Sequence, residues 1–153
     1  MKKLLLISAV LVFALFVLTA CFTKQALTAE EFKVQMEDMG YVVMENSTQY
    51  DSSIVRKLYI AKDSSNSFQI EFFEQNTEQD AIASFESNVR AMEAAKSGVS
   101  SSYSSNGQNY RKQTMTSNGE YWVVSGIDNT FLFVHTSTEN KAAVDEALNK
   151  LGY

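Results

Sequence analysis

Apolar residues recur at helical spacing in three segments of the chain, residues 27–40, 77–96 and 138–151. In the first segment, Thr28 stands before the first residue of the apolar stripe, and Glu31 lies three residues after Thr28. That pairing lets each side chain bond the other residue's backbone N–H at a helix start. An apolar stripe on an otherwise polar helix is buried against another layer of structure. We therefore predict three amphipathic helices.

Between these helices the apolar positions alternate with polar ones, which is the period of a β-strand. Asn118-Gly119 lies between two such runs, and this dipeptide strongly favours a tight hairpin turn. The hairpin of residues 54–74 is expected to have one polar face, with Val55 and Tyr59 on the face opposite Leu58. The predicted strands are residues 41–45, 54–62, 67–74, 108–116, 120–126 and 130–135.

A serine-rich segment without charged residues, 97–107, follows the second predicted helix. Such a segment buries too little apolar surface to order itself. We predict a mobile loop there.

The element order predicts the fold class: α+β, in two layers, with an antiparallel sheet of about six strands and the helices on one face. The order reads αβββαβββα, which is compatible with an internal duplication. Met39-Gly40-Tyr41 and Leu151-Gly152-Tyr153, at the ends of the first and last helices, are the one sequence similarity between the two halves.

The N-terminus has the layout of a signal peptide. Met1-Lys2-Lys3 is cationic, residues 4–18 are uncharged and mainly apolar, and Leu18-Thr19-Ala20-Cys21 follows. The apolar run is shorter than the ~20 residues of a membrane-spanning helix. Leu18-Thr19-Ala20-Cys21 resembles the lipobox of bacterial lipoproteins. The resemblance implies a diacylglyceryl group on the Cys21 thiol, cleavage before Cys21, and a protein held on the extracytoplasmic face of the cell membrane.

This interpretation divides the chain into a signal peptide at 1–20, a lipidated cysteine with a short tether at 21–26, and one domain at 27–153. The mature part is broadly similar to small surface lipoproteins of Gram-positive bacteria whose function is unknown, and this similarity transfers no functional residue. The alternative is a secreted protein cut after Ala20. It would leave the chain's only cysteine as a free thiol in an oxidising compartment, whereas lipidation gives that cysteine a role.

The composition is acidic, with 18 Asp and Glu against 13 Lys and Arg and a formal net charge of −5. Two of the lysines belong to the signal peptide, so the mature domain lies near −7. This balance argues against nucleic acid as a partner. The lone cysteine excludes an intrachain disulfide, so packing must stabilise the fold.

No catalytic or metal-binding motif occurs, so we predict a non-enzyme without a cofactor or metal. His135 is the only histidine, and it follows Phe131 and Phe133 at strand period, which favours a structural role on their face. The acidic residues are mostly at predicted helix starts or on polar strand faces, where solvation and the helix dipole explain them.

Aromatic residues on the predicted strands are the candidate binding surface. Where the opposite face already supplies apolar side chains, some of them are expected to point away from the helices and to stack sugars or dock a protein. The alternative is that a further layer, such as the serine-rich segment, covers them, or that they pair across strands. The candidate residues are Tyr59, Phe73, Tyr110, Tyr121 and Trp122.

Three functions fit these observations. The first is a non-catalytic binding or accessory module that is anchored through Cys21 and contacts an envelope protein or glycan. The second is an envelope hydrolase with paired carboxylates, which requires a cleft where their pKa values are moved apart. The third is a carrier of a small apolar ligand, with methionines lining an adaptable pocket.

Overall fold

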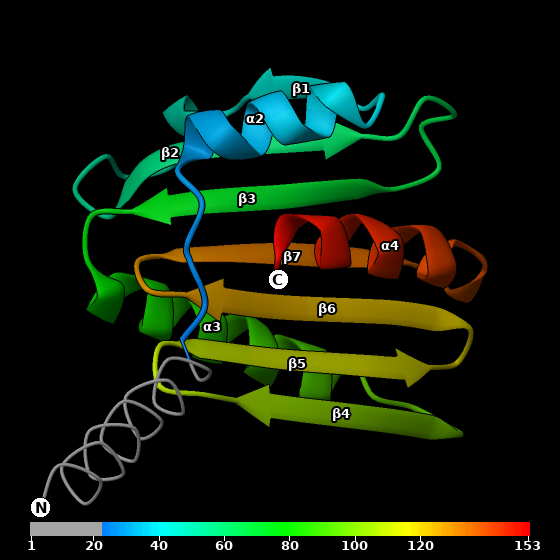
Figure 1. The fold of residues 1–153 in the computed structure, drawn as a ribbon. Helices are drawn as coiled ribbons and strands as arrows, with labels where there is room; N and C mark the ends of the chain where they lie inside the picture. Colours follow the sequence, from blue (N-terminus) through cyan, green and yellow to red (C-terminus); the bar gives the residue numbers. More distant parts are fainter. Residues whose placement is uncertain (1–22) are drawn as a thin grey trace, which may run out of the picture.

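A computed structural model of the protein describes residues 23–153, so Cys21 and the predicted signal peptide lie outside the described residues. The described part forms one antiparallel sheet of seven strands in the order β1-β2-β3-β7-β6-β5-β4 (Figure 1). The strands are β1 (Val42–Glu45), β2 (Val55–Lys62), β3 (Gln69–Gln75), β4 (Ser100–Asn106), β5 (Tyr110–Ser117), β6 (Glu120–Ile127) and β7 (Thr130–Ser137).

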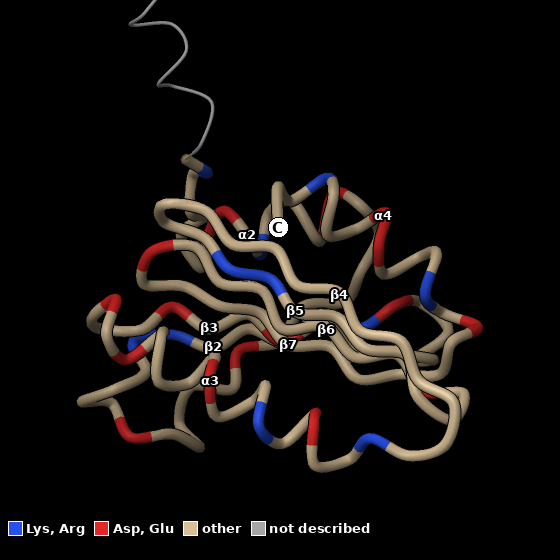
Figure 2. The backbone as a smooth tube through the Cα atoms, turned by 90° about the horizontal axis from the view of Figure 1, so that it is seen from below, with Lys and Arg blue, Asp and Glu red and all other residues tan. Residues whose placement is uncertain are grey.

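Three α-helices and two 3-10 turns complete the structure of residues 23–153. The helices are α2 (Ala29–Asp38), α3 (Glu78–Ala94) and α4 (Lys141–Leu151), and the turns are η2 (Ser47–Gln49) and η3 (Thr138–Asn140). Helices α2 and α4 lie on one face of the sheet and α3 on the other, as the edge-on view shows (Figure 2). No helix within residues 23–153 is both long and apolar enough to cross a bilayer.

The antiparallel α+β class and the three predicted helices are confirmed. At the start of α2, the Thr28 side chain accepts from the backbone of Glu31 and the Glu31 carboxylate accepts from the Thr28 backbone at 2.8 Å. The hairpin turn is also as predicted, because Asn118 and Gly119 have φ angles of 51° and 80°. These local signals are strong because each specifies a backbone conformation directly.

The predicted strand count was wrong, because the serine-rich segment predicted as a loop contains a seventh strand, β4. Its backbone pairs along β5 from Ser100 with Ser117 to Asn106 with Arg111. The Ser117 side chain, 3% exposed, also accepts from Ser97 N at 2.9 Å and donates to Ser97 O at 2.7 Å. Backbone pairing orders this segment without apolar burial, and the element order becomes αβββαββββα.

The prediction of two layers with all helices on one face was also wrong. The central strands carry apolar residues on both faces, so each face requires a cover. On β3, Phe72 packs in the cluster under α2 and α4, whereas Phe73 packs in the cluster under α3. The hairpin of β2 and β3 therefore has no polar face. The register of β2 shifts between Val55 and Lys57, which places Val55 with Leu58 rather than with Tyr59.

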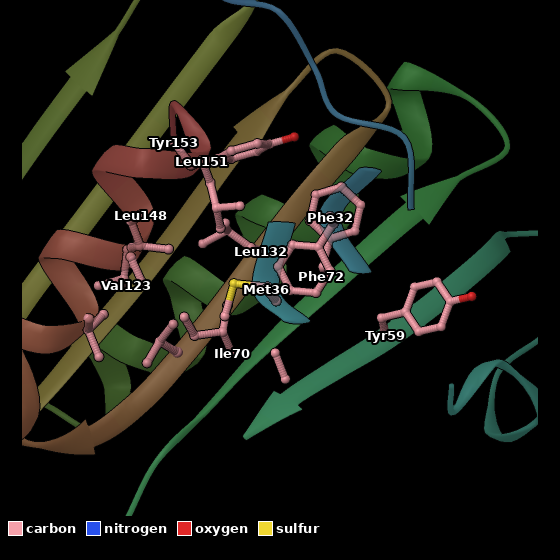
Figure 3. Close-up of a cluster of buried hydrophobic side chains, with 14 of the residues drawn as sticks. Phe32, Met36, Tyr59, Ile70, Phe72, Val123, Leu132, Leu148, Leu151 and Tyr153 are labelled. Atoms are coloured by element: carbon pink, nitrogen blue, oxygen red, sulfur yellow. The ribbon is translucent and has the colours of Figure 1, made fainter. Parts of the chain in front are cut away.

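The larger core lies under α2 and α4 (Figure 3). Phe32 of α2 stacks on Phe72 of β3 with ring centroids 4.6 Å apart. Leu148 and Leu151 of α4 are buried in the same cluster. We call this side of the sheet the α2/α4 face and the opposite side the α3 face.

The two meanders β1-β2-β3 and β5-β6-β7 meet at the pairing of β3 with β7. Helix α2 precedes the first meander and α3 precedes the second, but the second meander has the additional strand β4 and the two helices cover opposite faces of the sheet. Duplication therefore stays a hypothesis.

Candidate functional site

A groove of about 710 Å³ lies on the α2/α4 face, where β4 and β5 extend beyond the cover of α4. We call it the lysine groove, because three lysines and one aspartate line it. Hydroxyl groups from β4 and β5 line it as well. The residues that define it are Lys24, Ser101, Tyr103, Ser105, Tyr110, Lys112, Thr114, Thr116, Tyr121, Lys141, Asp145 and Tyr153.

Strand alternation places the polar floor of the groove. On β5, Lys112 and Thr114 point to the same face, and their neighbours on β4 are Ser105 and Tyr103. These strands lie at the edge of the sheet, where the α2/α4 face lacks a helix above it. The floor therefore stays accessible, and Tyr103 is 62% exposed.

Two of the lysines hold main-chain oxygens. Lys24 Nζ donates to the Gly152 carbonyl at 2.8 Å, and Lys112 Nζ donates to the main-chain oxygen of Tyr153 at 3.2 Å. Burial lowers the pKa of the Lys112 amine, and the positive charges of Lys24 and Lys141 lower it further against the opposing effect of Asp145. The amines of Lys24 and Lys141 thus lie close enough to destabilise the charge of Lys112, which a bound anion would relieve.

The wall of the groove is a network between β6 and α4. The Tyr121 hydroxyl donates to Asp145 Oδ1 at 2.6 Å, and Lys141 bonds the other carboxylate oxygen and lies over the Tyr121 ring. Burial acts to raise the pKa of Asp145, but the hydrogen bonds from Lys141 and Tyr121 outweigh burial and hold it below its usual range. Asp145 is therefore charged, and both of its carboxylate oxygens are already bonded. Among the side chains that line the groove, three lysines face this one aspartate, so their net charge is positive.

The end of the groove is fixed to the start of the described chain. The Asn109 side chain accepts from Lys24 N at 3.0 Å and donates to Lys24 O at 2.7 Å. From there the chain runs across the sheet to α2 (Figure 1). Lys24 Nζ lies over the Tyr110 ring, 5.0 Å from its centroid. A Cβ atom added to Gly107 would lie only 2.0 Å from an atom of the same ring. Glycine at 107 therefore allows the tyrosine to take this position.

A second hollow, of about 400 Å³, lies on the α3 face between β3, β7, α3 and the segment before β2. We call it the phenylalanine cavity. Its apolar lining comes from three phenylalanines of the sheet together with Tyr50, Ile54 and Val55, and its polar lining comes from two carboxylates, the Gln75 amide and the polar face of α3. The lining residues are Tyr50, Asp51, Ile54, Val55, Glu71, Phe73, Gln75, Ser84, Ser87, Asn88, Phe131 and Phe133.

The predicted exposed aromatic strip does not exist, because its five members are divided between the two faces. Tyr59 and Tyr121 are buried on the α2/α4 face, 5% and 2% exposed, and Tyr110 packs at the edge of the same cluster. Phe73 is buried on the α3 face, and Trp122 packs against the same cluster.

Alternation along single strands causes this division, so the aromatics mostly pack rather than present a surface. Tyr110 and Tyr121 still reach the lysine groove and Phe73 the phenylalanine cavity, whereas Tyr59 and Trp122 line neither.

His135 has the structural surroundings that its strand position predicted. Its ring stacks on Trp122 with centroids 3.5 Å apart, and its Nε2 lies 3.0 Å from Glu120 Oε2. Trp122 in turn contacts Phe133 edge-on at 6.1 Å. No cluster of three metal-ligating side chains occurs among the described residues.

Of the other two functional hypotheses, the hydrolase with paired carboxylates has a partial correlate at the phenylalanine cavity, and the methionine-lined carrier has none in the two hollows. Burial raises the pKa of Glu71, whereas hydrogen bonds from Ser53 hold that of Asp51 low, so two carboxylates of one cavity titrate apart. The Asp51 oxygen accepts from Ser53 N at 2.8 Å, which explains its shift as turn geometry. None of the methionines within residues 23–153 lines either hollow. Three of them, Met36, Met92 and Met115, are fully buried in the core.

The lysine groove was not predicted from sequence. A signal was present on β5, where Tyr110, Lys112, Thr114 and Thr116 follow one another at strand period. This strand face combines polar side chains with the aromatic Tyr110, so it differs from an apolar core face and from a purely polar, solvated face. The contribution of Lys24 and of the α4 residues is set by tertiary structure.

Comparisons with known proteins identify no family for this chain. No protein-family model matches it, and no curated protein does. Among solved structures, a GTP binding regulator from Thermotoga maritima is similar at a TM-score of 0.45 and 14% identity, over 82% of this chain and 88% of that one. A likeness at this level carries no argument about fold or function.

Proposed function

We propose that this protein is a lipid-anchored, non-catalytic binding module on the extracytoplasmic face of a bacterial membrane, and that the lysine groove binds an envelope component bearing phosphate and hydroxyl groups. The observation that carries the proposal is the concentration of Lys24, Lys112 and Lys141 around one groove of an acidic chain. Clusters of like charge are costly unless an opposite charge compensates them, and here Asp145 alone among the side chains lining the groove does so.

The lining indicates which anion fits. Lysine ammonium groups are compact charges that bind phosphate, and serine and threonine hydroxyls both donate and accept hydrogen bonds. Tyr103 and Tyr110 add aromatic surface of the kind that packs on sugar rings. A phosphate carried on a polyol or sugar satisfies all three components.

The position of the groove supports an envelope ligand. Lys24, which Asn109 fixes at the groove end, follows Cys21 by three residues, a reach of about 10 Å in an extended chain. If Cys21 carries the lipid, the groove lies close to the headgroups. Both an anionic lipid headgroup and an anchored polymer supply the required phosphate and hydroxyls there.

The test uses the full chain reconstituted in phosphatidylcholine vesicles and titrated by calorimetry with glycerol 1-phosphate. We expect saturable binding that Lys112→Gln weakens about tenfold, as the loss of a charge-assisted hydrogen bond does. Lys62→Gln, which removes the same charge from β2 outside the groove, is the matched control and leaves the affinity unchanged.

Two further arms separate the sources of the phosphate. Phosphatidylglycerol in the vesicles competes with the soluble probe if a lipid headgroup occupies the groove, and does not if a free polymer does. Equal affinities for Lys112→Gln and Lys62→Gln, or no saturable heat with the wild-type chain, contradict the proposal.

A further inference from the structure

The phenylalanine cavity combines an apolar floor with an unsatisfied polar group at its base. Phe73 and Phe131 stack with centroids 4.4 Å apart and an interplanar angle of 6°, and Tyr50 meets Phe73 edge-on at 5.4 Å. The stacked pair and the third ring at its edge form an apolar floor that is itself mostly buried. Its volume of about 400 Å³ lies within the range of small-molecule sites.

Gln75 supplies the polar group. Its side chain is 1% exposed, and its Nε2 donates to Ser84 Oγ at 2.7 Å. Its Oε1 is buried without a hydrogen-bond partner, the one such side-chain atom in the described part of the chain. A buried acceptor left unpaired costs stability, so native proteins pair such atoms or use them for a ligand.

Gln75 is held through both its main chain and its side chain. Gln75 N donates to the Asn129 carbonyl at 2.9 Å and Asn129 Nδ2 donates to Gln75 O at 2.8 Å. The bond from Nε2 to Ser84 keeps the amide in the cavity lining. A ligand hydroxyl both donates and accepts, so it satisfies the free amide atom in either orientation of the amide.

The charge around the cavity is negative. Glu71 and Asp51 line it, and no lysine or arginine does. Glu71 Oε1 accepts from Gln69 Nε2 at 2.7 Å, and burial raises the pKa of the carboxyl, so the carboxylate lacks the solvation or cation that would stabilise its charge. A positively charged ligand group would supply it.

The entrance is apolar and exposed. Tyr50 and Ile54, in the segment before β2, border the cavity at 44% and 43% exposure, whereas the phenylalanines of the floor, Phe73 and Phe131, are buried. Apolar residues at a rim reduce the cost of desolvating a ligand with an apolar body.

We propose that the phenylalanine cavity is a second binding site that takes a small aromatic molecule carrying both a hydroxyl and a cationic amine. The aromatic body lies between the phenylalanine floor and the exposed Tyr50 and Ile54, the hydroxyl bonds the Gln75 amide, and the amine faces Glu71. This site is on the opposite face of the sheet from the lysine groove and takes ligands of the opposite charge. It therefore does not depend on the proposed function of that groove.

The probe is tyramine, titrated by calorimetry into the full chain in phosphatidylcholine vesicles at pH 7. We expect saturable binding that weakens about tenfold in Gln75→Met and in Glu71→Gln, each of which removes one polar contact. Glu37→Gln, which changes an exposed glutamate of α2, is the matched control and keeps the wild-type affinity. Lys112→Gln also keeps it, because the groove is separate.

Two probes with parts of the ligand test each contact. Phenethylamine lacks the hydroxyl, so its affinity is expected to be weaker than that of tyramine and insensitive to Gln75→Met. 3-(4-Hydroxyphenyl)propionate has the opposite charge and is expected to bind weakest. Absence of saturable tyramine binding to a wild-type chain with an intact thermal transition overturns the proposal. Affinities unchanged by both Gln75→Met and Glu71→Gln also overturn it.

Discussion

Lys112 and Glu71 are charged residues on opposite faces of one sheet, and both are partly removed from water. Burial lowers the pKa of the Lys112 amine and raises that of the Glu71 carboxyl, so each environment disfavours the charged form. Side chains that only solubilise a surface are fully hydrated and escape this cost. At both positions the missing stabilisation is of the kind that a ligand of opposite charge provides.

Glu71 gives the protein a specific pH dependence. Because its pKa is raised in the folded state, the folded chain binds more protons than the unfolded chain just above the ordinary glutamate range. Stability therefore falls as pH rises through that window. We predict that Glu71→Gln raises the free energy of unfolding relative to wild type at pH 7 and that this gain shrinks toward pH 4. Chemical denaturation at both pH values measures it.

Glu37→Gln serves as the exposed control for this prediction, and its difference from wild type is expected to change little between the two pH values. A Glu71→Gln gain that is the same at pH 4 and pH 7 would show that the Glu71 charge is not destabilised by burial.

At the residue scale, the sequence predicted local roles better than tertiary contacts. The helix cap at Thr28 and the hairpin turn at Asn118 were predicted correctly, because each depends only on neighbouring residues. Lys112 and Gln75 could not be recognised, because their importance comes from partners on other elements: Lys24 and Asp145 for Lys112, and Ser84 of α3 for Gln75.

At the scale of elements, β4 is the feature that sequence patterns missed. It has no apolar alternation, and the sequence contains nothing to distinguish its serines from a linker. What orders it is pairing with β5 and the two hydrogen bonds between Ser117 and Ser97. The pairing joins backbone groups, and the two other bonds join the Ser117 side chain to the Ser97 backbone; composition reports neither.

The role of Ser117 predicts how β4 can be released. Ser117→Ala removes both hydrogen bonds to Ser97 and should cost about 1–2 kcal/mol of stability, from about 1 kcal/mol for each bond. Amide hydrogen exchange is expected to accelerate in β4 while the strands β3 and β7 keep their protection. Ser104→Ala, at an exposed position of the same strand, is the control.

If exchange in β4 is as slow in Ser117→Ala as in wild type, pairing with β5 alone holds the strand. A large loss of glycerol 1-phosphate binding in Ser117→Ala would in addition show that the groove requires an ordered β4.

At the scale of the whole molecule, the seven-stranded sheet separates two hollows whose lining side chains have opposite net charge. The antiparallel class was predicted correctly from the meanders. The third layer was missed, although apolar residues on both faces of the central strands, such as Phe72 and Phe73, require a cover on each face. The lysine groove opens next to the point where the chain leads toward Cys21. An anchored protein would thus present its cationic site near the membrane, although its overall charge is negative.

The most direct test of this account is photocrosslinking from the groove in living cells. A benzophenone amino acid replaces exposed Tyr103 in one strain and exposed Val34 of α2 in another, and adducts are identified by mass. We predict adducts with a phosphate-bearing lipid or glycan from position 103, lost when Lys112→Gln or Cys21→Ala is added, and none from position 34. Equal adducts from both positions, or adducts with proteins alone, would contradict the assignment of the groove as an anionic-ligand site.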